Sequence, residues 1–417
     1  MAGKTDENYF HRWLALKSTK EKSVDLLNAF EMSGYRWFST IRGYKQVKPI
    51  TRKHYIIGLT IDFLGLITVL RGFLIILIPN STIRILLGDL FVGSPAEEIQ
   101  VSLITMLFTL SSGLKYNGFL VERKGPIRVY QILYHEIRVS KFDRKQFMLT
   151  REDDSSLRKG WYLFGRFYFI ATPLTCLGIA GWLIFAFTVN PINYSNPVNL
   201  IATSFWTILT SIIFTLGAYS TIWLYCHNTM FIPFVTLSLN SVQKLGKSIM
   251  GHKKTAQGDI LKYFAQQNRI YNFIHLCTTD LGTIISYGVL IVSATADFAM
   301  FTSIFIGTGS DLFDYIILSV GIMSFGAIVG INVFSAFTTH RIALCNSVNY
   351  QLARRCKLDL QSSIKLLATC ERINTAPIGF TLSGIAIMDS EHLLLYLLEN
   401  AGLMLMFITN FNKATVN

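Results

Sequence analysis

The sequence is poor in charged residues. Of its 417 residues, 15% are charged and 51% are hydrophobic, whereas a soluble domain carries roughly a quarter charged residues. The shortage comes from long apolar runs that alternate with polar, basic connectors. This alternation argues against a soluble protein and is typical of a polytopic membrane protein. The net charge is +13, and the positions of the basic residues are expected to set the orientation of the chain in a membrane. Nucleic acid is therefore not expected as a partner.

The sequence also lacks any constellation that would support catalysis. It contains no Walker phosphate loop, no HExxH pair and no His/Cys cluster with the spacing of metal ligands. His227, His252, His275 and His340 are scattered, and surface or interfacial positions are expected for them. We therefore expect neither an enzyme nor a cofactor or metal.

Seven apolar runs are long enough to cross a bilayer as helices, which takes about 20 residues each. Helices are expected because backbone groups cannot go unpaired in lipid. Residues 1–20 lack an apolar core, so the first run is expected to act as the insertion signal. The predicted spans are residues 55–78, 99–121, 161–188, 200–226, 281–306, 315–337 and 391–411.

The positions of Lys and Arg predict the orientation. Of the 38 such residues, 33 lie in the first 54 residues or in the connectors that follow the second, fourth and sixth spans. The opposite connectors and the tail contain Arg84 and Lys413. Because positive connectors stay in the cytosol, the N-terminus is predicted to be cytosolic and the C-terminus extracellular. This orientation is opposite to that of G-protein-coupled receptors and argues against that class.

Two other features agree with this orientation. The glycosylation sequons begin at Asn80 and Asn193, and both lie in connectors predicted to be outside. None of the six cysteines lies in an outer connector, so reduced thiols are expected and an extracellular disulfide is not.

The inner connectors are long and have helical periodicity. Apolar residues continue beyond the fourth span to about Leu239, with a kink expected at Pro233. Residues 259–279 suit an amphipathic lead-in to the fifth span, and a further helix is expected over 358–372. We therefore expect an all-α membrane protein whose inward helix extensions form a cytosolic bundle. Its predicted parts are a cytosolic segment 1–54, a seven-helix domain 55–411 with cytosolic anchor segments 227–280 and 338–390, and an extracellular tail 412–417.

Ionisable residues inside membrane spans are costly and indicate a structural or functional contact. Lys115 and Arg166 lie near the predicted cytosolic ends of their spans, and their side chains are expected to reach the headgroups. Arg71 and Asp297 lie at similar depths in the outer halves of their spans. They either pair with each other or face a hydrated cavity. Asp62 is another acid deep within a span.

The last span, which Ser390 is expected to cap, carries an acid at its centre. Glu399, Leu403, Phe407 and Asn410 share one helical face. A carboxylate at mid-membrane must face protein or water, so this face turns away from lipid. Around a symmetry axis, Glu399 would form a ring that favours cations, and Leu403 and Phe407 an apolar gate. The alternative is a bond between Glu399 and another helix of the same subunit.

The layout and the final third of the chain resemble the insect gustatory and odorant receptor superfamily. Residues 378–384 and the short polar break after them look like the segment before the family's last helix. That helix typically carries Thr-Tyr, five apolar residues and then Gln-Phe. The matching positions here are Leu403-Met404, residues 405–409 and Asn410-Phe411. The Thr-Tyr pair is absent, so the chain resembles a divergent gustatory-receptor-like member.

The resemblance implies a chemosensory receptor of the plasma membrane that acts as a tetrameric, ligand-gated, non-selective cation channel. The subunits would be identical or related, the cytosolic bundle would hold them together, and a small molecule would be the ligand. Phe407, Asn410 and Phe411 would lie at the end of a pore lined by the last helix. The ligand pocket would lie in the outer half of the first six helices. Aromatic candidates at that depth, each also consistent with plain helix packing, are Phe108, Trp182, Phe185, Phe205, Trp206, Phe298 and Tyr315.

A non-channel membrane protein with the same topology is the main alternative function. Such a protein would act as a scaffold or a trafficking factor, and the missing Thr-Tyr pair is compatible with it. A monomer in mild detergent would favour this alternative. A secondary transporter would be expected to show internal repeats, which the sequence lacks.

Overall fold

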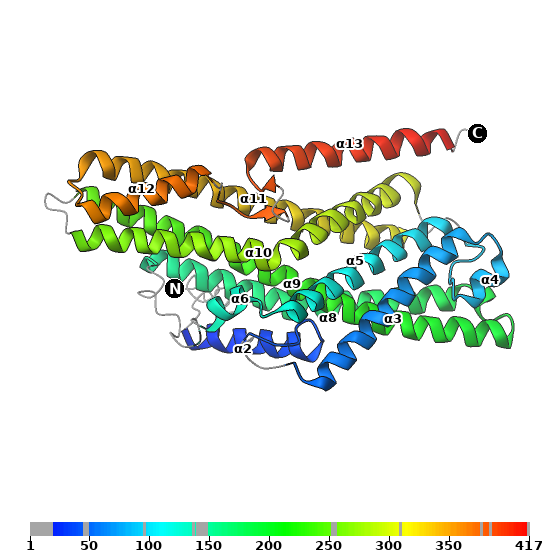
Figure 1. The fold of residues 1–417 in the computed structure, drawn as a ribbon. Helices are drawn as coiled ribbons and strands as arrows, with labels where there is room; N and C mark the ends of the chain where they lie inside the picture. Colours follow the sequence, from blue (N-terminus) through cyan, green and yellow to red (C-terminus); the bar gives the residue numbers. More distant parts are fainter. Residues whose placement is uncertain are drawn as a thin grey trace, which may run out of the picture.

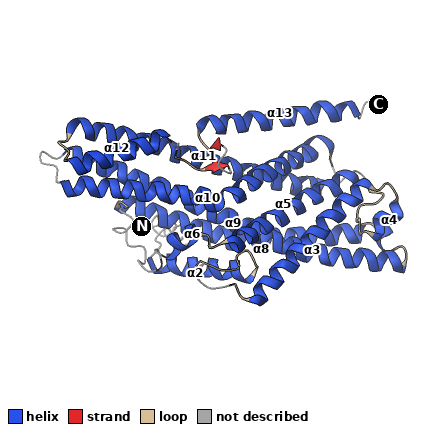
Figure 2. Cartoon of the chain, viewed as in Figure 1, coloured by secondary structure: helices blue, strands red, loops and turns tan. Residues whose placement is uncertain are grey.

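The computed structural model describes residues 20–44, 50–94, 97–135, 138, 149–251, 257–307, 311–375, 378–382 and 386–414. These residues form an elongated bundle of helices with one small hairpin (Figures 1 and 2). The α-helices are α2 Lys20–Arg36, α3 Arg52–Leu77, α4 Ser81–Leu86, α5 Glu97–Lys124, α6 Arg128–Tyr130, α8 Arg151–Val189, α9 Pro197–Gly251, α10 Gln257–Phe301, α11 Asp311–Arg355, α12 Leu360–Thr375 and α13 Ser390–Ala414. Short turns of other helix types are η1 Gln131–His135, η2 Pro191–Tyr194 and η3 Thr302–Ile306. The antiparallel hairpin pairs β1 Thr381–Leu382 with β2 Ala386–Ile387.

The predicted spans all fall within helices. In the described part of the chain, six helices are long and apolar enough to cross a membrane, namely α3, α8, α9, α10 with η3, α11 and α13. The second predicted span lies in α5, which is not among the six because Lys115 and several Ser, Thr and Asn residues interrupt its apolar run. The chain is therefore a multi-pass membrane protein, and the crossing by α5 stays a prediction.

Three helices are much longer than a membrane crossing requires. α9 has 55 residues and α10 and α11 have 45 each, whereas about 20 residues span the bilayer. Their extensions pack with α12 at one end of the bundle, called here the inner end (Figure 1). α4 lies at the opposite, outer end. The predicted helical extensions are thus confirmed, while the assignment of the inner end to the cytosol still rests on the charges.

The N-terminal segment contains a helix that the sequence reading did not predict. α2 packs against α8 and α9 and buries Phe30 completely. Beyond α2, the Tyr44 hydroxyl lies 2.6 Å from Nε2 of His227, and Nδ1 of His227 lies 2.9 Å from the Trp223 carbonyl oxygen. Because a carbonyl only accepts, Nδ1 donates to it and Nε2 accepts from Tyr44. His227 is fully buried, so the expected surface position was wrong: both of its ring nitrogens are satisfied inside the protein.

A buried ion pair joins α3 to α5 within the predicted membrane region. Nζ of Lys115 lies 2.7 Å from Oδ1 of Asp62, and each side chain is 4% exposed. The prediction that Lys115 reaches the headgroups was therefore wrong, because a carboxylate on the neighbouring helix offsets the cost of burying its charge.

Replacing Lys115 with Met should destabilise the folded chain by about 3–5 kcal/mol, because it leaves the Asp62 carboxylate buried without its partner. The Asp62→Leu/Lys115→Met double variant should regain most of that loss, since it leaves no lone charge. Thermal unfolding in a fixed detergent measures both effects. A double variant less stable than Lys115→Met would contradict this account of the pair.

Candidate functional site

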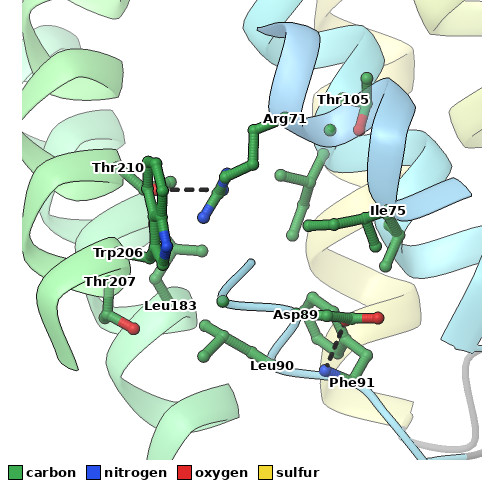
Figure 3. A pocket seen from close by; sticks show the side chains of 14 residues that line it. Arg71, Ile75, Asp89, Leu90, Phe91, Thr105, Leu183, Trp206, Thr207 and Thr210 are labelled. Atoms are coloured by element: carbon green, nitrogen blue, oxygen red, sulfur yellow. Dashed lines mark hydrogen bonds between the residues drawn. The ribbon is translucent and has the colours of Figure 1, made fainter. Parts of the chain in front are cut away.

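A small cavity lies near the outer end of the bundle, between α3, α5, α8 and α9 and beneath the connector that follows α4 (Figure 3). Its volume is about 30 Å³, which is room for about two water molecules. The walls are mostly apolar and include Ile75, Leu90 and Leu183, with Arg71 and Thr210 as polar groups. Its lining of apolar side chains with a few polar groups resembles that of a small-molecule site, although such sites usually have volumes of about 300–1,000 Å³.

Arg71 is the basic side chain of this cavity, and it reaches from α3 to α9. Nη1 donates to the Leu87 carbonyl oxygen at 3.1 Å, and Nη2 donates to Oγ1 of Thr210 at 3.2 Å. The guanidinium carbon lies 4.7 Å from the centre of the Trp206 ring, a favourable cation–π distance. Of the two alternatives for Arg71 and Asp297, the structure excludes pairing, because α3 packs mainly against α5 and α9 and Asp297 lies on α10.

Asp297 lies where α10 meets α13. Its side chain is buried, and neither carboxylate oxygen has a hydrogen-bond partner among the described residues. Ser293, one turn earlier, donates to Oδ1 of Asn400 at 2.7 Å, and the Phe301 ring, one turn later, lies 5.3 Å from the Phe407 ring. Residues four apart share a helical face, so Asp297 faces α13.

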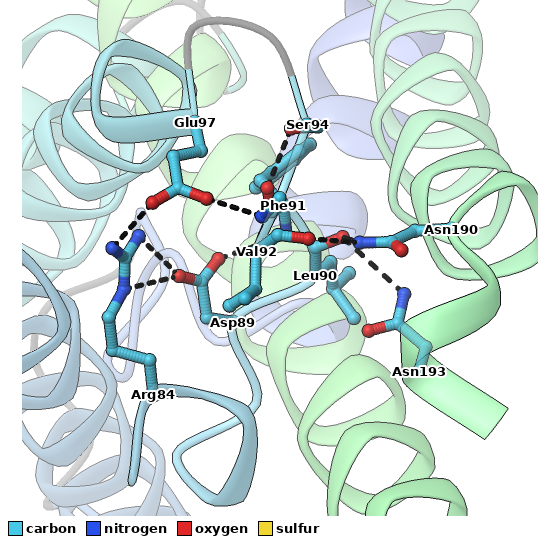
Figure 4. Close-up of polar contacts among 10 residues, drawn as sticks. Arg84, Asp89, Leu90, Phe91, Val92, Ser94, Glu97, Asn190 and Asn193 are labelled. Atoms are coloured by element: carbon cyan, nitrogen blue, oxygen red, sulfur yellow. Dashed lines mark hydrogen bonds and ion pairs between the residues drawn. The ribbon is translucent and has the colours of Figure 1, made fainter. Parts of the chain in front are cut away.

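The connector between α4 and α5 closes the cavity at the outer end through a set of charged contacts (Figure 4). Arg84 lies 2.6 Å from Oδ2 of Asp89 and 2.7 Å from Oε1 of Glu97. The Phe91 N–H donates to Oδ1 of Asp89 at 3.0 Å. Burial raises the pKa of Asp89, although the Phe91 N–H and Arg84 act in the opposite direction. Burial lowers the pKa of Arg84, but Asp89 and Glu97 outweigh that effect and raise it overall.

Two asparagines fasten this connector to the end of α8. Nδ2 of Asn190 donates to the carbonyl oxygens of Leu90 and Val92, both at 3.0 Å. Nδ2 of Asn193 donates to the Leu90 carbonyl oxygen at 3.4 Å, and the Asn193 side chain is fully buried. In the folded chain the amide nitrogen of Asn193 is enclosed by protein, which disfavours the predicted glycosylation at this position. The sequon pattern alone does not show this burial.

Asn80, the other predicted glycosylation site, lies on the surface. Its Oδ1 accepts from the N–H groups of Thr82 and Ile83 and so caps α4. The cap uses the oxygen only, and the exposed amide nitrogen stays available. Glycosylation of Asn80 remains a prediction.

The structure does not gather the seven predicted ligand-binding aromatics at one place. Trp206 lines the cavity, and its Nε1 donates to the Leu86 carbonyl oxygen at 3.1 Å. Phe108 packs against Phe214 in the core. Trp182 and Phe298 belong to a separate buried cluster between α5, α8, α10 and α11. The remaining three are exposed on the outside of the chain: Phe185, Phe205 and Tyr315.

The predicted pore residues lie on α13, which runs along one side of the bundle and contacts α10 and α11 (Figure 1). Glu399 and Leu403 are exposed in the single chain, and Glu399 makes no hydrogen bond or ion pair with the described residues. Phe407 is half buried against Phe301 on α10. The side chains of Asn410 and Phe411 are outside the described part of the chain.

The cap of α13 differs from the prediction by one residue. Oδ1 of Asp389 accepts from the His392 N–H at 2.9 Å, and Ser390 is already the first residue of the helix. Asp389 is therefore the capping residue, because its side chain is placed to satisfy a free N–H of the first turn.

Sequence analysis missed the residues of the connector that form one wall of the cavity. Asp89 and Leu90 come from a polar loop whose path no periodic pattern indicates. Thr207 and Thr210 lie on the buried side of α9, where small polar residues resemble ordinary helix packing. The one available signal was Arg71, a charged residue in a predicted span.

These features define a polytopic, all-helical membrane protein with a cavity near its outer end and a last helix that contacts the bundle on one side. Neither a protein-family model nor a curated protein matches the sequence. The fold is nevertheless similar over nearly the whole chain to solved structures of an insect receptor.

One of these structures is the insect olfactory receptor OR5 from Machilis hrabei in complex with eugenol. It has a TM-score of 0.58 and 12% identity, and the match covers 98% of this chain and 100% of that chain. Another structure of the same receptor has a TM-score of 0.55 and 14% identity, and covers 97% and 98% of the two chains. The resemblance to the insect gustatory and odorant receptor superfamily is thus confirmed at the level of the fold.

The two sequons should behave differently in cells. Thr82→Ala, which removes the Asn80 sequon, should abolish the mobility shift that glycosidase treatment produces in the wild type. Ser195→Ala removes the other sequon but keeps Asn193 and its hydrogen bonds, and this variant should keep the shift. Gel mobility before and after treatment measures both. Loss of the shift in Ser195→Ala would mean that Asn193 carries the glycan.

Proposed function

We propose that this chain is a subunit of a chemosensory receptor in the plasma membrane that acts as a ligand-gated, non-selective cation channel, with α13 lining the pore. The likeness of its fold to structures of an insect olfactory receptor supports this proposal, and one of those structures contains eugenol, a small organic molecule. In this chain the ligand would occupy the outer cavity around Arg71 and Trp206.

Glu399 is the observation on which the proposal depends. Its carboxylate is exposed at the middle of an apolar helix, and a charged side chain at the bilayer centre costs about 2.5–3.5 kcal/mol on insertion scales. A water-filled axis shared by several subunits removes that cost. α13 leaves most of its surface free of the rest of the chain, so copies of the helix can approach one another around such an axis.

Contacts between helices connect the outer cavity with the proposed pore. α5 contributes Val101 and Thr105 to the cavity and packs against α10. α10 in turn holds Phe407 of α13 against Phe298 and Phe301. A ligand that fits the cavity better in one arrangement of α5 would shift α10 and withdraw Phe407 from the pore. The ligand opens the channel only if it binds the open state more tightly than the closed one.

α12 supports the assembly of several subunits. Its Leu360, Ile364 and Leu367 are 78%, 57% and 69% exposed, and this spacing places them on one helical face. The opposite face, with Leu366 and Thr369, is buried against the bundle. An exposed apolar stripe on a helix predicted to lie in the cytosol, outside the lipid, marks a contact with another protein. Neighbouring subunits of a tetramer would cover it.

The double variant Ile364→Lys/Leu367→Lys should dissociate the tetramer, because two charges would replace the centre of the apolar stripe. Gln361→Lys, which adds one charge at an exposed position of α12 that is already polar, should leave the tetramer intact. Light scattering of the purified protein in mild detergent gives the mass of each. A monomeric wild type would contradict the channel proposal and favour the scaffold or trafficking alternative.

Glu399→Gln should lower the preference for cations over anions by roughly tenfold, the low end of the ion enrichment in a charged cleft. Phe407→Ala should raise the current without ligand, because it shortens the apolar gate. Glu391→Gln, the same exchange at the start of α13, serves as the control and should resemble the wild type. Whole-cell recording with surface labelling measures all three. Wild-type currents from both Glu399→Gln and Phe407→Ala would remove α13 from the pore.

A further inference from the structure

Arg71 has hydrogen-bonding capacity that the protein does not use. A guanidinium carries five N–H donors, and two of these have acceptors, the Leu87 carbonyl oxygen and Thr210. Nε is buried and has no partner within the described ranges. Burying a charged donor without an acceptor is costly, so the site favours a species that brings acceptors with it.

Within the described residues, Arg71 also forms no ion pair with a carboxylate. Asp89 is the acid that lines the same cavity, but its Oδ2 contacts Arg84 and its Oδ1 accepts the Phe91 N–H. In Figure 3 the Asp89 carboxylate points away from the Arg71 guanidinium. The Arg71 guanidinium is therefore contacted by a carbonyl, a hydroxyl and the Trp206 ring, while Asp89 attracts it from a distance without forming an ion pair with it.

We infer that the outer cavity binds the carboxylate of a small organic acid, with Arg71 as the group that recognises it. The planar fork of a guanidinium matches two carboxylate oxygens. The cavity of about 30 Å³ holds about two waters, so a bound acid would displace these waters and push aside the side chains around it. The apolar side chains of Ile75, Leu90 and Leu183 around it suit a short alkyl chain.

This inference rests on the proposed receptor function, for which it names the class of ligand. Acetate and propionate are the simplest acids of that class. Acetamide and propionamide have nearly the same shapes without the charge, so the two pairs separate recognition of a carboxylate from recognition of any oxygen. Chloride is the inorganic anion that would satisfy the same positive charge.

The test measures binding to the purified wild type in detergent at neutral pH, by calorimetry and thermal shift, in sulfate buffer and again with added chloride. Each acid should bind at least about tenfold more tightly than its amide, the difference expected for one charge-assisted hydrogen bond. Added chloride should not displace the acids. Equal binding of acid and amide, or displacement by chloride at the concentration of the acid itself, would overturn the inference.

Variants locate the site. Arg71→Gln should weaken acid binding by about 10- to 100-fold, and Arg71→Lys should fall between it and the wild type because it keeps the charge without the fork. Arg166→Gln, an exposed arginine in another predicted span, should bind as the wild type does. A folded Arg71→Gln protein with unchanged acid affinity would overturn the assignment. The comparison of acid with amide on the wild type stands even where a variant does not fold.

Failure of this inference can be told apart from failure of the channel proposal. Acid binding in detergent without any acid-evoked current in cells would refute the channel and support the ligand class. Currents evoked by neutral molecules alone, together with no acid binding, would refute the ligand class and support the channel.

Discussion

Charge inside the bilayer is the constraint on which this structure depends. An ionisable side chain in a span needs a partner, a polar enclosure or water. Lys115 and Asp62 satisfy this need in a pair, and Arg71 satisfies it with a carbonyl, a hydroxyl and an aromatic ring. Asp297 is enclosed between two helices. Glu399 has neither a partner nor an enclosure among the described residues, and in the proposed assembly other subunits and water would surround it.

α9 and α10 connect the regions of the molecule in which these charged residues lie. α9 supplies the Trp206 and Thr210 side of the outer cavity, and near its middle it holds His227 within a cluster of aromatic rings. α10 contacts α5 on one side and α13 on another. In the proposed channel, a movement in the outer half would therefore pass through these packed helices.

The sequence predicted the helices better than it predicted which helices pack against one another. Spans and extensions followed from runs of apolar residues, since a bilayer requires a minimum helix length. α2 was missed although Ser23, Leu27 and Phe30 form a buried helical stripe, because its surroundings are polar. A sequence gives the depth of a residue along its helix but not the neighbouring helix that it faces. Similar depth therefore left Asp297 open as a partner for Arg71, although the two lie on helices that pack elsewhere. The pairing of helices depends on close packing between them. At Gly72 on α3, for example, a Cβ would lie 2.4 Å from Oγ1 of Thr105 on α5.

The buried amide of Asn193 has a consequence for how the protein is made. Oligosaccharide transfer acts on a chain as it emerges into the lumen, whereas Asn193 becomes enclosed only after α8, η2 and the connector with Leu90 have come together. A chain that carried a sugar on Asn193 could not form the contact between this side chain and the connector at Leu90. A sugar on Asn193 and the native packing of this corner therefore exclude one another.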